Sequence, residues 1–196
     1  RKVSRQESLQ KNLPYLIFFQ GGPGYESPRP ISDSGWIKRA IEDYNVLLID
    51  QRGTGLSSPI CSDSIKNMED NYLAEYLSFF RADNIIRDAE YIRENIFNIH
   101  KWSILGQSFG GFCAINYLSF FPEHLDKVFI TGGIPPLNAH PDEIYRATYK
   151  RVLKKNKLFY EIFPQAKINA KKIADFIFEN DVKLPNGDIL SLRRFQ

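Results

Sequence analysis

The amino-acid sequence predicts an α/β fold, in which a mainly parallel sheet carries helices on both faces. Three observations predict it. Four short, continuous apolar runs each end in a turn that contains glycine, a pattern typical of strands buried on both faces of a sheet. Stretches with helical spacing of apolar residues lie between the later runs, and such alternation indicates parallel strands. The 196 residues are 43% hydrophobic and 25% charged, a composition typical of a folded domain.

The expected elements follow one another in a regular order. The first two strands are joined by a loop, and from there helices alternate with strands. Strands are expected at residues 15–20, 46–50, 102–106 and 127–131. Helices are expected at residues 83–97 and 109–121. Ligands of such sheets bind beyond the carboxyl ends of the strands, so we expect the loops after these strands to converge at one edge.

After residue 136 the pattern changes. Two Lys-rich amphipathic helices are expected at residues 142–163 and 165–180, and a turn follows them. The sequence therefore predicts a sheet-containing core at residues 1–136 and a separate helical unit at residues 137–196. The helical unit is basic, whereas the chain as a whole has a net charge of only +3. Solvated helix faces explain this charge better than a nucleic-acid site, because the basic runs mostly lack interleaved aromatic residues.

The composition disfavours several classes of protein. The longest apolar runs are far shorter than the roughly 20 residues that a membrane-spanning helix needs, so no membrane partner is expected. Cys61 and Cys113 are widely separated and cannot by themselves form a metal site or a disulfide framework. Two isolated cysteines are compatible with the cytoplasm, which is the expected location. The sequence leaves the oligomeric state open.

Ser108 is the candidate nucleophile. It lies in the sequence GQSFGG, which contains G-x-S-x-G between a predicted strand and a predicted helix. This is the context of a nucleophile elbow, in which a strained turn exposes the serine and small neighbours let strand and helix approach. Gln107 belongs to the same turn and lies at the rim of the expected site. The helix that follows directs its first N–H groups toward developing negative charge.

Two loops offer backbone amides for an oxyanion hole. The sequence GGPG follows the first predicted strand and leaves its N–H groups exposed beside the sheet edge. We assign the N–H of Gly22, with Gly21 as its neighbour, and the N–H of Phe109, which follows the nucleophile. Gln20 and Gly24 flank these glycines at the rim.

A third loop, DQRGTGLS, follows the second predicted strand. Its Asp50 and Arg52 have the chemistry of a catalytic acid and an anion-binding group. A structural role is favoured, as an ion-paired, hydrogen-bonded turn that shapes the rim of the site, because perturbed ion pairs are often structural.

In this order and spacing, the three motifs resemble the prolyl iminopeptidase (proline aminopeptidase) family of α/β-hydrolases. The resemblance covers residues 13–137, and residues 184–196 are similar to part of that family's helical cap. Gln20 stands where the family usually has histidine before GGPG. The resemblance implies a partial α/β-hydrolase fold with the beginning of a helical cap. It also implies a serine aminopeptidase that needs no metal or organic cofactor.

The expected substrate is a peptide with a free N-terminus. By the resemblance, Ser108 attacks the carbonyl of the N-terminal residue, preferably proline, forms an acyl-enzyme and releases the shortened peptide. Acidic groups of the cap bind the substrate's ammonium group in this family. Glu143, Glu161 and Glu179 are candidates here, although solvated helix faces explain them better.

A serine nucleophile also needs a base and an acid that orients it. In this fold the acid and then the histidine follow the serine along the chain. His124 lies at the wrong end of its helix, His140 precedes any suitable acid, and His100 precedes its strand at the opposite edge. We therefore expect the catalytic Asp and His beyond Gln196, and we expect residues 1–196 alone to be inactive.

Two other functions stay open. One is an esterase or other acyl hydrolase on the same scaffold, because a fold does not determine the substrate. The other is a non-catalytic, hydrolase-like binding protein.

Overall fold

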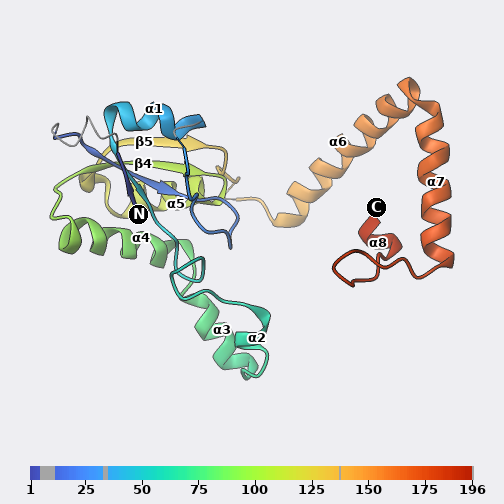
Figure 1. Ribbon diagram of the computed structural model, residues 1–196, viewed down its shortest axis with the longest axis horizontal. Coiled ribbons are helices and arrows are strands. Elements are labelled where there is room, and N and C mark those ends of the chain that lie inside the picture. Colours follow the sequence, from blue (N-terminus) through green and yellow to red (C-terminus); the bar gives the residue numbers. More distant parts are fainter. Residues whose placement is uncertain (5–11, 33–34, 137, 196) are drawn as a thin grey trace. The chain divides into compact units, whose positions relative to one another are not determined.

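The computed structural model describes residues 1–4, 12–32, 35–136 and 138–195 (Figure 1). The chain forms two compact units, Arg1–Pro135 and Pro136–Gln196, which are described separately. Within the described residues, no helix combines the length and the apolar character needed to cross a membrane.

The first unit is built on a five-stranded sheet with the strand order β1-β3-β2-β4-β5. The strands are β1 (Lys2–Val3), β2 (Tyr15–Phe19), β3 (Asn45–Leu48), β4 (Trp102–Gln107) and β5 (Leu125–Thr131). The last four pair in parallel, and β1 pairs antiparallel with β3. All four predicted strands and their mainly parallel arrangement are confirmed. The prediction missed β1, whose two residues are too few to show a pattern.

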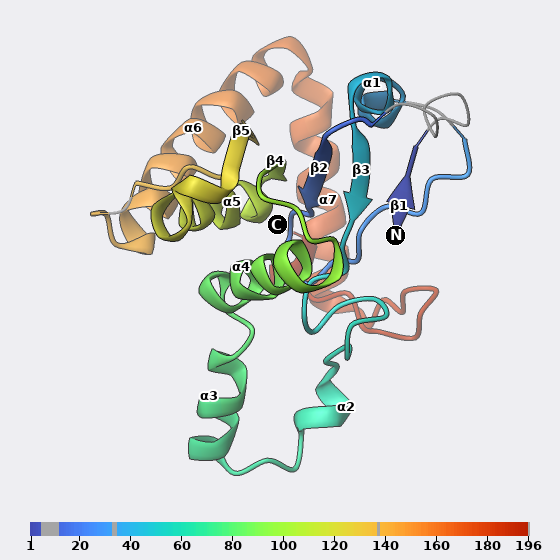
Figure 2. The ribbon, with the colours of Figure 1, turned by 90° about the vertical axis from the view of Figure 1, so that its left-hand side faces the viewer.

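Helices of the first unit lie before, between and after the strands. They are α1 (Gly35–Asp43), α2 (Ser62–Ile65), α3 (Asp70–Ser78), α4 (Ala82–Tyr91), a π-helical turn (Ile92–Ile96), α5 (Phe109–Phe120) and a 3₁₀ turn (Pro122–His124). The loop predicted between β2 and β3 was wrong in part, because it contains α1. The helix predicted at 83–97 is confirmed as α4 with the π-helical turn at its end. Figure 2 shows α2 and α3 extending away from the sheet, and neither helix buries a residue.

The sheet is covered by helices on both faces, as the sequence predicts. Successive side chains of a strand point to opposite faces. Ile17 and Phe19 of β2 therefore pack with α4 and α5, whereas Leu16 and Phe18 pack with α1 on the other face. Burial of these continuous apolar runs on both faces fixes the sheet between two helical layers, and it leaves the carboxyl ends of the strands free to carry the site.

The second unit consists of α6 (Pro141–Ile162), α7 (Pro164–Glu179) and the short α8 (Leu192–Phe195). The two predicted helices are confirmed, and an isolated bridge between Lys183 and Ile189 closes the predicted turn. Among the described residues of this unit, only Ile177 is buried. The interpretation of this second unit as part of a cap stays a prediction.

Candidate active site

Ser108 lies on a strained turn between β4 and α5. Its backbone has φ 54° and ψ −117°, a left-handed φ that a residue other than glycine rarely adopts. Its N–H donates to the carbonyl of Thr131 at 3.0 Å, and its own carbonyl accepts from the Gly111 N–H at 2.8 Å. The side chain is exposed at the carboxyl end of β4. The strand, turn and helix around Ser108 therefore have the geometry of a nucleophile elbow.

The glycines of the motif are required by close backbone contacts. A Cβ atom on Gly106 would lie 2.2 Å from the carbonyl oxygen of Gly110, and one on Gly110 would lie 2.0 Å from the carbonyl oxygen of Phe19. A Cβ atom on Gly133, after β5, would lie 1.7 Å from the Ser108 carbonyl oxygen. Backbone atoms cannot rotate away as a side chain can. Glycine at these positions thus lets α5 begin directly against the strand ends.

Replacement of Gly106 by alanine is expected to lower the free energy of unfolding by roughly 3 kcal/mol or more, because strand and helix must separate. Gly24→Ala provides the matched control, because Gly24 has φ 104° but nothing within 4 Å of a Cβ atom. That control carries only backbone strain, of about 1–2 kcal/mol. Urea titration of both variants measures the difference, and equal losses of stability would contradict the steric explanation.

The two amides best placed for an oxyanion hole belong to Gly22 and Phe109. Phe109 is the first residue of α5, and neither its N–H nor that of Gly22 has a hydrogen-bond partner among the described residues. The Gly21 N–H, in contrast, donates to Oε1 of Gln20 at 3.0 Å. The contact fits a neighbouring position for Gly21 rather than a donor position, and the assignment of Gly22 and Phe109 as the donors stays a prediction. Gly21 instead provides space, since a Cβ atom there would lie 3.1 Å from Cβ of Ser108.

Asp50 and Arg52 each form an ion pair with a residue from elsewhere in the chain. Both carboxylate oxygens of Asp50 bind the guanidinium group of Arg29. Arg52 binds Asp88 of α4 through two hydrogen bonds of 2.7 and 2.5 Å, and it also donates to the Phe79 carbonyl. The hydrogen bond to Asp88 raises the pKa of Arg52. This arrangement favours the structural role for both residues.

Burial by itself would raise the pKa of Asp50. Hydrogen bonds from Arg29 and from the backbone N–H groups of Leu56 and Ser27 outweigh burial and lower this pKa to about 2. The carboxyl group is thus held ionised, with a side chain only 8% exposed. A carboxylate held in this way is a poor general acid or base at neutral pH.

Replacement of Asp50 by asparagine is expected to cost about 2 kcal/mol of stability at neutral pH, the equivalent of its lowered pKa. The folded-state pKa lies below the unfolded value near 4. The stabilisation is therefore present above about pH 4 and is lost as the pH falls toward 2. Urea titrations at pH 7 and pH 3 should show a smaller difference between variant and wild type at the lower pH. Asp63→Asn, at an exposed ion pair, is the control, and a difference that does not change with pH would contradict the assignment.

The two histidines of the first unit lie at the opposite end of the sheet from Ser108. His124 directly precedes β5 and His100 lies just before β4, whereas Ser108 follows the carboxyl end of β4. The seven residues of β5 separate His124 from that edge by about 20 Å. His140 belongs to the second unit, where it is exposed and accepts from the Asp142 N–H at the beginning of α6. Neither His100 nor His124 can thus serve Ser108 as a base.

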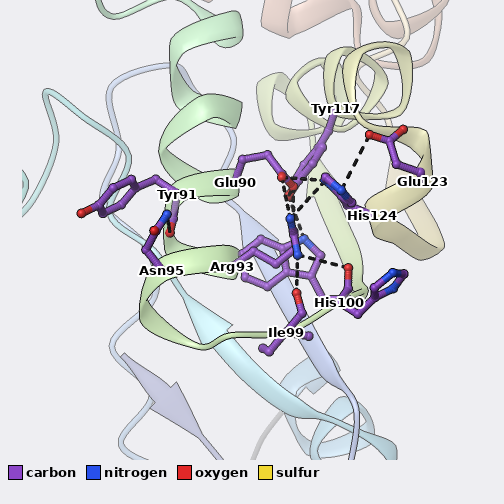
Figure 3. Close-up of polar contacts among 10 residues, drawn as sticks. Glu90, Tyr91, Arg93, Asn95, Ile99, His100, Tyr117, Glu123 and His124 are labelled. Atoms are coloured by element: carbon purple, nitrogen blue, oxygen red, sulfur yellow. Dashed lines mark hydrogen bonds and ion pairs between the residues drawn. The ribbon is translucent and has the colours of Figure 1, made fainter.

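His124 belongs instead to a buried polar network that the sequence did not reveal (Figure 3). Glu90 of α4 is its centre and binds Arg93 through hydrogen bonds of 3.0 and 2.9 Å. The same carboxylate accepts from the Tyr117 hydroxyl and lies 2.7 Å from Nδ1 of His124. Arg93 also donates to the carbonyls of Ile99 and His100. The network joins the ends of α4 and α5 beneath the amino ends of β4 and β5.

The charges of this network stabilise one another. Burial would raise the pKa of Glu90, but hydrogen bonds from Arg93, Tyr117 and His124 lower it overall. Burial and the neighbouring Glu90 raise the pKa of Tyr117 well above its usual range. The Tyr117 hydroxyl therefore stays protonated and also accepts a hydrogen bond of 3.0 Å from the Trp102 indole.

Among the described residues, no group of three or more His, Cys, Asp and Glu side chains is arranged to hold a metal ion. The exposed positions of Glu143, Glu161 and Glu179 agree with solvated helix faces in the second unit.

Comparison with known proteins identifies a family and several relatives. The family model for the alpha/beta hydrolase fold matches residues 14–180. A proline iminopeptidase of Aeromonas sobria is 49% identical over 196 residues, which are 100% of this chain and 46% of that protein. The proline iminopeptidase aneH of Aspergillus aculeatus is 38% identical over 191 residues, which cover 94% of this chain and 42% of that protein. The chain therefore spans less than half the length of these curated relatives.

One of the solved structures to which this chain is similar is 2-hydroxy-6-oxo-6-phenylhexa-2,4-dienoate hydrolase from Rhodococcus sp. strain RHA1. It is 27% identical with a TM-score of 0.45, and the match covers 68% of this chain and 43% of that one.

Proposed function

The chain belongs to the α/β-hydrolase fold family, and on this basis we propose that the protein is a serine aminopeptidase that releases N-terminal proline from peptides. The observation that carries the proposal is the geometry at Ser108, an exposed hydroxyl on a strained turn beside two amides that have no hydrogen-bond partner among the described residues. The similarity to proline iminopeptidases supports the choice of substrate. The substrate is then a peptide with a free N-terminus, and a cytoplasmic location is proposed with it.

In this mechanism the Ser108 hydroxyl oxygen attacks the carbonyl carbon of the N-terminal residue, while its proton passes to a base. The Gly22 and Phe109 N–H groups bind the oxyanion of the tetrahedral intermediate. Its collapse breaks the peptide bond, and the amine of the shortened peptide leaves with the proton. Water then attacks the acyl-enzyme and releases the free amino acid.

The base and its orienting acid are proposed to lie outside residues 1–196. The acid and histidine of this fold follow the nucleophile along the chain, and the first unit's histidines lie at the wrong end of the sheet. Purified residues 1–196 should therefore not hydrolyse substrate above the level of the Ser108→Ala variant. Turnover above that level would contradict this assignment and direct attention to His140.

The test compares a proline arylamide with a short-chain aryl ester as substrates of the full-length protein. Cleavage of the arylamide, together with labelling of Ser108 by a fluorophosphonate, is the expected result. Ester cleavage without arylamide cleavage would identify an esterase on the same scaffold instead. Absence of Ser108 labelling would favour a non-catalytic binding protein.

A further inference from the structure

Residues 20–26 are called the oxyanion loop here. The Gln20 side chain forms hydrogen bonds with backbone groups near both ends of this loop. Its Nε2 group donates to the Glu26 carbonyl at 3.2 Å, and its Oε1 atom accepts from the Gly21 N–H at 3.0 Å. One amide group thus contacts both ends of the loop that presents the Gly22 N–H.

The neighbouring loop holds both ends of the oxyanion loop from outside. Gln51 is buried and donates from Nε2 to the Gln20 carbonyl at 3.1 Å. The Asp50 carboxylate accepts from the Ser27 N–H at 3.0 Å, just after the loop. The peptide groups on either side of Gly21 and Gly22 are therefore fixed, and the remaining freedom lies in the glycines themselves.

The bond to Gln20 decides which glycine amide is available to a substrate. An oxyanion hole works when its donors already point to the position of the developing charge. The Gly21 N–H is bound to Gln20, so the peptide plane before Gly21 has a defined orientation. The Gly22 N–H, at φ 124°, is left without a partner among the described residues. Without the Gln20 amide, the Gln20–Gly21 peptide group keeps only the hydrogen bond that Gln51 donates to its carbonyl. The Gly21 N–H then loses its partner and competes with the Gly22 N–H, and the hole loses part of its fixed geometry.

We propose that Gln20 is a positioning residue that orients the oxyanion loop, so that Gly22 and not Gly21 binds the oxyanion; this inference rests on the proposed function. The role requires a side chain that both donates and accepts. The glutamine amide does so at every pH, because it does not titrate. A neutral imidazole has the same two capacities, but a protonated imidazole can no longer accept.

Steady-state kinetics of Gln20→Met in the full-length protein test the proposal. Methionine has a similar length but cannot form either hydrogen bond. We expect kcat on a proline arylamide to fall about 10- to 100-fold while KM changes little, because the oxyanion exists only in the transition state. Asn95→Leu is the matched control, because it removes an exposed amide whose one hydrogen bond lies within its own helical turn.

Gln20→His separates positioning from general loss of structure. Neutral histidine should restore much of kcat near pH 8, and the rescue should be lost as the imidazole is protonated below about pH 6.5. Dividing kcat of the variant by kcat of the wild type at each pH cancels the titration of groups that both proteins share. An unchanged kcat in Gln20→Met, or no rescue by histidine, overturns the proposal.

Two measurements separate this inference from the proposed function. Hydrogen exchange of the Gly21 amide needs no catalysis and should be faster in Gln20→Met; unchanged exchange overturns the proposal. If the wild-type protein fails to cleave the arylamide, the proposed function is wrong. In that case, the rate at which a fluorophosphonate labels Ser108 tests the same oxyanion hole, because its amides also bind the phosphoryl oxygen of the reagent. Equal labelling rates in wild type and Gln20→Met would overturn the positioning role.

Discussion

Replacement of Ser108 by alanine in the full-length protein is expected to lower kcat on a proline arylamide by about 10⁴- to 10⁶-fold. The variant removes the one atom that forms the acyl-enzyme, while the backbone that holds it remains. Residual hydrolysis should come only from substrate binding and from the amides of Gly22 and Phe109. Initial rates across substrate concentrations measure the loss, which should lie in kcat rather than in KM.

Ser119→Ala is the matched control for this variant. Ser119 lies on the same helix, α5, is exposed, and donates only to the Ile115 carbonyl one turn earlier. Its loss should leave kcat unchanged. Substantial arylamide cleavage by Ser108→Ala would show that a different residue supplies the nucleophile.

Replacement of Arg93 by methionine is expected to lower the free energy of unfolding by about 3–5 kcal/mol, because it leaves Glu90 buried without its main partner. The two side chains are only 6% and 11% exposed. The variant also removes the donors to the Ile99 and His100 carbonyls, which hold the chain before β4. Urea titration at neutral pH measures the change.

Arg87→Met tests whether burial causes the effect. Arg87 pairs with Asp83 on the same helix, α4, but its side chain is 55% exposed. An exposed pair of this spacing contributes about 0.3–0.5 kcal/mol.

The pH dependence of the Glu90–Arg93 pair follows from the lowered folded-state pKa of Glu90. The stabilisation by this pair is present above the unfolded pKa near 4.3 and declines below it. Equal losses in Arg87→Met and Arg93→Met would contradict the buried-pair explanation.

The parts of the fold that could be predicted are those that depend on local sequence patterns. Continuous apolar runs marked the four long strands because both faces of the sheet are covered. Glycine spacing marked the elbow because Gly106 and Gly110 touch backbone atoms. The helix α1 escaped prediction because only Ile37 and Ile41 of its nine residues are buried. The strand β1 pairs through two residues, and its position depends on β3.

Partners that lie far apart in sequence could not be predicted. Arg29 and Asp50 are 21 residues apart, and Arg52 and Asp88 are 36 apart. The Glu90–Arg93 pair has the spacing of an ordinary surface pair, and nothing in the sequence shows that it is buried. The partner of the Gly21 amide depends on how one side chain folds back on its own backbone. Such rotamer choices follow from the tertiary structure and cannot be deduced from residue type.

The segment that carries α2 and α3 has a consequence for how this scaffold can change. Residues 61–81 include no buried side chain. Near its two ends the segment is bonded to the loop of Arg52, because the Ile60 N–H donates to the Gly53 carbonyl and Arg52 donates to the Phe79 carbonyl. Natural insertions and deletions can therefore accumulate between these points without a cost in core packing. Related proteins should therefore differ in length mainly at residues 61–81, while the sheet and the nucleophile elbow keep a constant size.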